Sequence, residues 1–172
     1  SVPPNRLVFV DDNPVETTVN GQLVLTYSEF SEMEASEHYV VIAIADSVAR
    51  KNVAERCSKD GIKFWSVTAS NIVIMDEVQI GEGSILSPFV TLTSNIRIGQ
   101  HFHANIYSYI EHDCVIGDFV TFAPAVKCNG NVVIEDHAYI GAGAMLKQGK
   151  SGDPLIIGCR AIVGMGAVVI QN

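Results

Sequence analysis

One histidine of the sequence lies between two carboxylates, because Glu111, His112 and Asp113 are consecutive. A neighbouring carboxylate can hold an imidazole in one tautomer and raise its pKa. A histidine held in this way is suited to take a proton from a substrate as a general base. A polar residue at an exposed turn would account for the same string, so the element that carries His112 decides between the two interpretations.

A second acidic pair, Asp11 and Asp12, follows the apolar run at 6–10 and precedes the turn formers Asn13 and Pro14. Ligands of open parallel sheets bind beyond the carboxyl ends of the strands. A carboxylate at such a strand end can accept hydrogen bonds from ribose hydroxyls or from a base N–H. An ordinary turn is the alternative interpretation of the pair.

The elements around this acidic pair indicate an α/β segment. Apolar runs at 6–10, 39–45 and 63–67 predict strands. Between the last two, Asp46 and Ser47 are N-cap candidates for a helix that ends near Gly61. Strand, helix and strand in this order predict a parallel βαβ unit. We therefore expect residues 1–69 to form a partial Rossmann-like nucleotide-binding domain.

From residue 74 onward the sequence is a repeat of six. Apolar anchors occupy 13 consecutive positions from Ile74 to Leu146, and the register resumes at Ile157 after five extra residues around 149–154. Glycine often follows the anchor, and small or β-branched residues lie four positions after it. A period of six predicts a triangular β-solenoid in which three hexads make one coil. Residues 70–172 then form about five coils, and His112 lies at a corner.

Composition narrows the possible partners of this chain. Lys and Arg number 11 against 19 Asp and Glu, a net charge of −8, which makes a nucleic-acid partner improbable. The longest apolar run, Tyr39 to Ala45, is far shorter than the ~20 residues of a membrane-spanning helix. Four cysteines without a C-x-x-C pair indicate reduced thiols, so we expect a cytoplasmic protein.

The hexad pattern resembles the left-handed parallel β-helix of the hexapeptide acyltransferases. The whole chain is similar to a narrower group, the nucleotide-sugar N-acetyltransferases that acetylate a 4-amino sugar, such as the bacillosamine and perosamine acetyltransferases. Three stretches carry the resemblance: FVDDNP at 9–14, NIYSYIEHDCVIGDF at 105–119 and LIIGCRAIVGMGAVV at 155–169. In that group a strand and a glycine-rich loop precede the DDNP strand, so we expect this sequence to be part of a longer chain or one domain of a bifunctional enzyme.

The resemblance implies an enzyme that uses acetyl-CoA to acetylate the C4 amine of a UDP- or dTDP-linked 4-amino-4,6-dideoxy sugar for surface glycans or glycoproteins. His112 would be the general base and Asp113 would orient it. Asn105 and Glu111 match positions near the sugar amine, and the Asp11–Asp12 turn matches the nucleotide site.

The acetyl and coenzyme sites also follow from the resemblance. The group often has a second histidine nine residues after the first, where this chain has Thr121. Oxyanion stabilisation would then fall on the N–H of Gly130, with the Thr121 hydroxyl as a second donor. The coenzyme would contact three small corner residues and two basic ones: Ala142, Gly143, Gly164, Lys147 and Arg160. Tight turns and solvated charges are the alternative interpretation of these five, and the group predicts a homotrimer with active sites between subunits.

Three other functions share this fold pattern. An O-acetyltransferase for another sugar acceptor is the nearest, and a non-catalytic β-helix scaffold is the second. The third is metal catalysis of the γ-class carbonic anhydrase type, but the H-x4-H pair of that class is missing. His101 and His103 could in principle contribute to a metal site. We expect no metal.

Overall fold

The computed structural model describes residue 3, residues 6–34 and residues 37–172. By its internal contacts the chain forms two compact units, residues 1–38 and residues 39–172. Neither helix in the described part has the length and apolar character that crossing a membrane requires.

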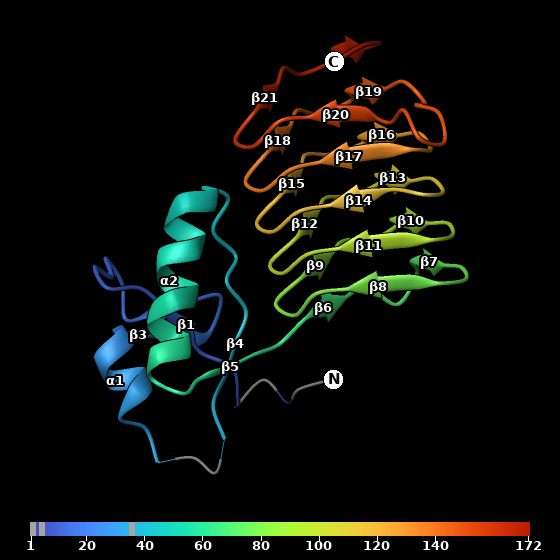
Figure 1. Ribbon diagram of the computed structural model, residues 1–172. Helices are drawn as coiled ribbons and strands as arrows, with labels where there is room; N and C mark the ends of the chain where they lie inside the picture. The colour runs from blue at the N-terminus through green and yellow to red at the C-terminus, as the bar shows by residue number, and fades with distance from the viewer. Residues whose placement is uncertain (1–2, 4–5, 35–36) are drawn as a thin grey trace. The chain divides into compact units, whose positions relative to one another are not determined.

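The first unit is a small three-stranded sheet with one short helix (Figure 1). Its elements are β1 (Phe9–Val10), β2 (Thr18–Val19), β3 (Gln22–Leu25) and α1 (Tyr27–Ser31). Strand β3 pairs in parallel with β1 and in antiparallel with β2. The hairpin turn uses Asn20 and Gly21, both at positive φ, as a two-residue turn of this kind requires. The predicted strand at 6–10 is therefore present but shorter.

The second unit begins with the predicted βαβ arrangement. Strands β4 (Tyr39–Val40) and β5 (Lys63–Phe64) pair in parallel across helix α2 (Ser47–Lys59). The Asp46 carboxylate caps α2 by accepting the Ala49 N–H at 2.7 Å. The chain leaves the helix through Gly61 at a φ of +73°. Together with the sheet of the first unit, this confirms a small α/β region before the repeat.

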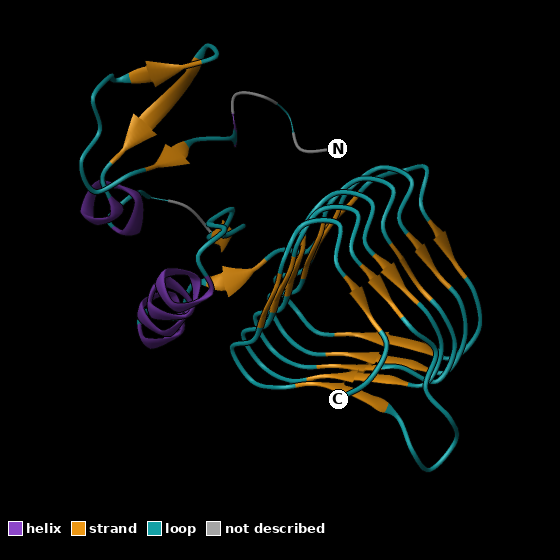
Figure 2. Ribbon diagram, turned by 90° about the horizontal axis from the view of Figure 1, so that it is seen from above, coloured by secondary structure: helices purple, strands orange, loops and turns teal. Residues whose placement is uncertain are grey.

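The hexads form a left-handed β-helix with three flat faces (Figure 2). The first face contains β6 (Val67–Thr68), β9 (Ile85–Leu86), β12 (His103–Ala104), β15 (Thr121–Phe122), β18 (Tyr139–Ile140) and β21 (Ile162–Val163). The second contains β7 (Val73–Ile74), β10 (Thr91–Leu92), β13 (Tyr109–Ile110), β16 (Lys127–Cys128), β19 (Met145–Leu146) and β22 (Val168–Val169). The third contains β8 (Val78–Ile80), β11 (Ile96–Ile98), β14 (Val115–Ile116), β17 (Val132–Ile134) and β20 (Leu155–Ile157).

Strand register follows the hexad count. Neighbouring strands of a face are parallel and three hexads apart in sequence, as Thr91 opposite Tyr109 shows. The separation is larger by the five inserted residues where Val132 lies opposite Leu155. The anchors fill the interior, since those from Leu86 to Leu146 are each at most 6% exposed. The repeat therefore produces one continuous core.

The corners are made by a residue three positions after each anchor. Asn95, Asp113, Asn131 and their counterparts every six residues have φ between about 50° and 70°, a left-handed conformation that Asn, Asp and Gly tolerate best. The glycines directly after the anchors are required for a different reason, which is the close approach of successive coils. A Cβ on Gly99 would lie 2.8 Å from the Asp118 nitrogen of the next coil, so the coils approach too closely for a side chain there.

A buried arginine links α2 to the β-helix by hydrogen bonds. Arg50 is 0% exposed, and its guanidinium donates to the Ile44 carbonyl at 2.7 Å and to the Phe119 carbonyl at 2.6 Å. It also donates to the Thr121 hydroxyl at 3.0 Å. Burial lowers the pKa of Arg50 to about 10. These bonds tie the βαβ segment to the first face, which is why residues 39–69 belong to the same compact unit as the repeat.

Candidate active site

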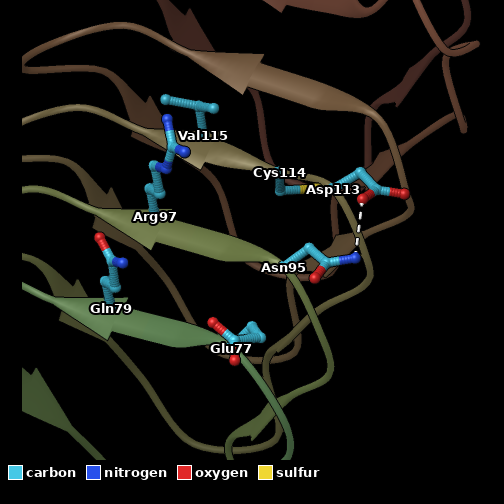
Figure 3. A pocket seen from close by; sticks show the side chains of 7 residues that line it. All are labelled: Glu77, Gln79, Asn95, Arg97, Asp113, Cys114 and Val115. Atoms are coloured by element: carbon cyan, nitrogen blue, oxygen red, sulfur yellow. Dashed lines mark hydrogen bonds between the residues drawn. The ribbon is translucent and has the colours of Figure 1, made fainter.

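His112 lies at the corner between β13 and β14, and its ring is held by the adjacent carboxylate. The His112 Nδ1 and Asp113 Oδ2 are 2.8 Å apart. Asn95, one coil earlier at the same corner, donates through Nδ2 to Asp113 Oδ1 at 3.1 Å (Figure 3). Three side chains therefore form a chain of hydrogen bonds that ends on the imidazole.

The electrostatics of this corner favour a basic histidine. The hydrogen bond with Asp113 raises the pKa of His112 above its ordinary value. The hydrogen bonds from His112 and Asn95 lower the pKa of Asp113, so this carboxylate is ionised at neutral pH. An ionised carboxylate only accepts hydrogen bonds, so the Nδ1 of His112 carries the proton. The lone pair of the neutral ring then lies on Nε2, which is the atom available to accept a proton.

Gly130 lies against the imidazole one coil later. A Cβ added at Gly130 would lie 2.6 Å from both Cε1 and Nε2 of His112. Within the described part of the chain the Gly130 N–H has no hydrogen-bond acceptor, while its carbonyl accepts the Gly149 N–H at 3.0 Å. Gly130 therefore lies beside the basic nitrogen, and its backbone N–H is free to donate a hydrogen bond to a substrate oxygen.

Backbone bonds and one side-chain network hold this corner in place. The Asn131 N–H donates to the His112 carbonyl at 2.9 Å. Asn129 accepts from the Tyr109 hydroxyl at 2.9 Å and donates to the Leu146 carbonyl at 2.7 Å. The corner is therefore supported by the coils on either side, while the His112 side chain itself stays 42% exposed.

A shallow hollow of about 320 Å³ opens beside the corner on the face formed by β8, β11 and β14 (Figure 3). Glu77, Gln79, Asn95, Arg97, Asp113, Cys114 and Val115 line it. Solvent therefore reaches Asp113 and Asn95 from this face. The two side chains are held together by their hydrogen bond and not by surrounding packing.

The other predicted residues fall on all three corners. Glu111 and Lys147 share the corner of His112 and Gly130, since Lys147 follows β19 where Glu111 follows β13. Asn105 lies at the corner between β12 and β13, and its side-chain oxygen accepts the Ile106 N–H at 2.8 Å.

The small residues predicted to contact the coenzyme share the corner of Asn105 in later coils. Ala142 and Gly143 lie between β18 and β19, and Gly164 follows β21. Gly143 has a φ of +69°, and its N–H donates to the Pro124 carbonyl at 2.9 Å, so it makes a tight turn. Arg160 lies on the third corner, between β20 and β21.

Thr121 lies on the first face, in β15, away from the His112 corner. Its side chain is 9% exposed, and its hydroxyl accepts a hydrogen bond from Arg50. The structure therefore does not bring Thr121 and His112 together within one chain.

The acidic pair of the first unit lies at the carboxyl end of β1. The Asp11 carboxylate accepts the Asn13 N–H at 2.9 Å, and the Asp12 carboxylate accepts the Tyr27 N–H at 3.2 Å. Both residues are exposed. The pair therefore stabilises its own turn and still presents carboxylate oxygens to solvent.

His101 is buried and His103 is partly buried, and the two have different neighbours. The His101 ring stacks on Phe119 at 5.0 Å, and Arg50 lies 3.4 Å from Nδ1 of His103. Burial and the nearby Arg50 lower the pKa of His103 to about 4. The described residues contain no cluster of three His, Cys, Asp or Glu side chains that could hold a metal ion.

Asn95 belongs to this corner but was not among the residues predicted from the sequence. It lies one coil before Asp113, just as Gly130 lies one coil after His112. The coil length was therefore the signal that could have found it.

Comparison with known proteins places this chain in a family. No family model matches the chain. It is 51% identical over 152 residues to GDP-perosamine N-acetyltransferase of Escherichia coli O157:H7, covering 88% of this chain and 69% of the relative. Among solved structures, WeeI from Acinetobacter baumannii AYE is 56% identical with a TM-score of 0.97, covering 100% of this chain and 81% of that one.

A more distant structure shares the fold. PerB from Caulobacter crescentus, solved in complex with CoA and GDP-perosamine, is 24% identical with a TM-score of 0.84, covering 92% of this chain and 75% of that one. The close relatives carry the assignment: this chain belongs to the family of hexapeptide-repeat N-acetyltransferases that includes GDP-perosamine N-acetyltransferase.

Proposed function

We propose that this protein transfers the acetyl group of acetyl-CoA to the amine of a nucleotide-linked amino sugar. The observation that carries the proposal is the His112–Asp113 pair with the Gly130 N–H beside it, in a chain 51% identical to a GDP-perosamine N-acetyltransferase. The acceptor predicted from the sequence is the 4-amine of a 4-amino-4,6-dideoxy sugar.

The corner suits direct transfer without a covalent enzyme intermediate. The sugar amine attacks the thioester carbonyl while Nε2 of His112 takes the amine proton. Asp113 holds Nδ1–H and stabilises the imidazolium that forms. The N–H of Gly130 donates to the oxygen that becomes negative. The C–S bond then breaks, and the coenzyme leaves as a thiol after it receives the proton from His112.

The identity of the nucleotide on the acceptor sugar does not follow from the reaction. The sequence suggested a UDP- or dTDP-linked acceptor, whereas the E. coli relative is named for GDP-perosamine and the C. crescentus protein is solved with it. Asp11 and Asp12 remain the proposed nucleotide contacts, because their exposed oxygens lie at a strand end. The product would enter surface-glycan or glycoprotein synthesis in the cytoplasm.

A homotrimer would explain the distribution of the predicted contacts. Asn105, His112 and Arg160 lie on three different corners of the triangular β-helix, and Arg160 is in a later coil than the other two; one side of such a coil spans roughly 15–20 Å. A site that used all of them would need corners from neighbouring subunits. We therefore propose active sites between subunits, with Ala142, Gly143, Gly164, Lys147 and Arg160 as coenzyme contacts. Thr121 is 9% exposed and bonded to the buried Arg50, so it is not proposed as a donor to the acetyl oxygen.

Thiol release from acetyl-CoA tests the proposal. The full chain is mixed with GDP-perosamine and with UDP- and dTDP-linked 4-amino sugars, beside His112→Ala and Glu55→Ala. We expect release with an amino sugar only, a fall in kcat of about 10²–10⁴ in His112→Ala, and near wild-type turnover in Glu55→Ala, whose side chain is 66% exposed on α2. Hydroxylamine-labile acetyl in the product would instead show O-acetylation, and no release from a folded chain would favour the scaffold.

A further inference from the structure

We infer that Asn95 is a positioning residue for the general base: it fixes the Asp113 carboxylate, and through it the ring of His112. The inference rests on the proposed function, because it assigns a role within that catalytic corner.

The first observation is the geometry of the contact. Asn95 Nδ2 donates to Oδ1 of Asp113 at 3.1 Å, while Oδ2 of the same carboxylate is 2.8 Å from Nδ1 of His112. The two oxygens of one carboxylate therefore have different partners on opposite sides. A carboxylate held at both oxygens cannot rotate away from the imidazole without breaking a hydrogen bond.

The second observation is that the backbone sets the two side chains in register. Asn95 and Asp113 occupy the same corner in successive coils, and both have left-handed φ values, 57° and 59°. The Asp113 N–H donates to the Ser94 carbonyl at 3.1 Å, and the Asn95 N–H donates to the Asp76 carbonyl at 3.2 Å. Because these bonds already order the backbone, the side-chain contact costs little additional conformational entropy.

The third observation is exposure. The side chain of Asp113 is 49% exposed, and the hollow on the β8–β11–β14 face opens beside it. Water competes for an exposed carboxylate, and a second donor is needed to keep one orientation populated. Asn95 supplies this donor, and it also lowers the pKa of Asp113, which keeps the carboxylate ionised.

The chemistry explains why an amide suits this position. An Asn side chain donates to Asp113 without adding charge, whereas a carboxylate would repel it and a lysine would compete with His112 for it. Asn also tolerates the left-handed backbone of the corner. The two requirements, a neutral donor and a positive φ, coincide in asparagine.

Two substitutions separate the side-chain contact from the backbone requirement. Asn95→Gly removes the donor without strain, since Gly83, Gly143 and Gly166 occupy the equivalent corner position at φ near +70°. Asn95→Asp keeps the size and replaces the donor with an acceptor. Glu77→Gly, at φ 54° one coil earlier, is the matched control.

We expect kcat to fall about 10-fold in both Asn95 variants, with KM for acetyl-CoA and for the amino sugar changed less than two-fold. In Asn95→Gly the acidic limb of kcat/KM should move to lower pH, because the His112–Asp113 bond that raises the pKa of His112 is weakened. Glu77→Gly should keep the wild-type kcat. In an Asp113→Asn background, Asn95→Gly should cost nothing further.

Wild-type kcat in both Asn95 variants, or an equal loss in the Asp113→Asn background, would overturn the inference. An NMR titration of the His112 ring gives a reading that does not depend on turnover. We expect its pKa to fall in Asn95→Gly, and an unchanged value would contradict the role of Asn95 even if the acceptor proved to be a different molecule. A wild-type chain that acetylates no amino sugar would refute the proposed function while leaving this titration valid.

Discussion

Gly130 leaves no room for a side chain beside the His112 ring, and Gly130→Ala tests this packing. A Cβ at this position would lie 2.6 Å from Cε1 and Nε2, whereas ordinary contacts begin at 3.4 Å. The ring must therefore move by about 0.8 Å, the difference between these two distances. Because the His112 side chain is 42% exposed, it can swing outward, and the substitution should cost little stability.

The cost should instead appear in the rate. A displacement near 1 Å of a catalytic group can lower turnover by about 10²-fold. We expect Gly130→Ala to lower kcat 10- to 100-fold, with a melting temperature close to that of the wild type. Alanine retains the backbone N–H, so this loss reports the position of His112 and not the removal of the oxyanion donor.

Gly158→Ala is the matched control for this prediction. The nearest atom to its added Cβ is the Glu135 carboxylate at 3.9 Å, so the methyl group fits. Thiol release from acetyl-CoA gives kcat, and thermal unfolding gives stability. If Gly130→Ala turned over as fast as Gly158→Ala and the wild type, the position of the His112 ring inferred from the structure would be wrong.

Three further predictions concern the fold. Arg50→Ala should destabilise the chain by about 3–5 kcal/mol in urea unfolding, because it leaves buried carbonyls without donors, whereas Lys51→Ala on the exposed face should cost less than about 0.5 kcal/mol. Leu92→Ala removes a fully buried anchor and should cost about 2–5 kcal/mol, against a much smaller loss for the outward Val115→Ala. His103 has a folded pKa of about 4, below its ordinary 6.5, so the unfolded chain binds more protons between these values and stability should fall as pH drops from 6.5 to 4. Melting temperatures across that range should decline less in His103→Gln, and an equal decline would exclude His103 as the cause.

The repeat was readable from the sequence because its signal is periodic. Each anchor from Leu86 to Leu146 is buried as the hexad count predicts, and the five extra residues appear as the longer separation between the paired strands β17 and β20. Residues 111–113 also lie at a corner of the β-helix, as predicted. A periodic pattern fixes which residues face inward and which stack, since every coil repeats the same geometry.

The helix shows where a local pattern was insufficient. The apolar spacing from Val48 to Cys57 correctly predicted α2, and Cys57 is fully buried, but Val48 is 46% exposed while Arg50, which is outside that apolar set, is 0% exposed. An arginine on a helix is usually solvated, and the sequence contains no sign that carbonyls from the segment after β4 and from the first face converge on it. That environment exists only after the helix packs on the β-helix.

The left-handed corners were a second omission. The sequence pattern shows glycines directly after many anchors, whereas the positive φ values fall two positions later and mostly on residues other than glycine. The glycines are needed where successive coils approach, as at Gly99. Backbone conformation at a corner is set by how the faces join, which residue type alone indicates weakly.

The sequence by itself determined the β-helix, its coil length, the α/β segment and the acidic-flanked histidine, because each of these depends on periodicity or on adjacent residues. The tertiary structure decided which residues meet the His112–Asp113 pair: Asn95, which bonds Asp113, and Gly130, which lies against His112, are each one coil away, so these contacts depend on how the coils stack. It also decided that Thr121 is bonded to Arg50 on another face. These contacts join residues that are distant in sequence, and only the folded chain determines their distances and orientations.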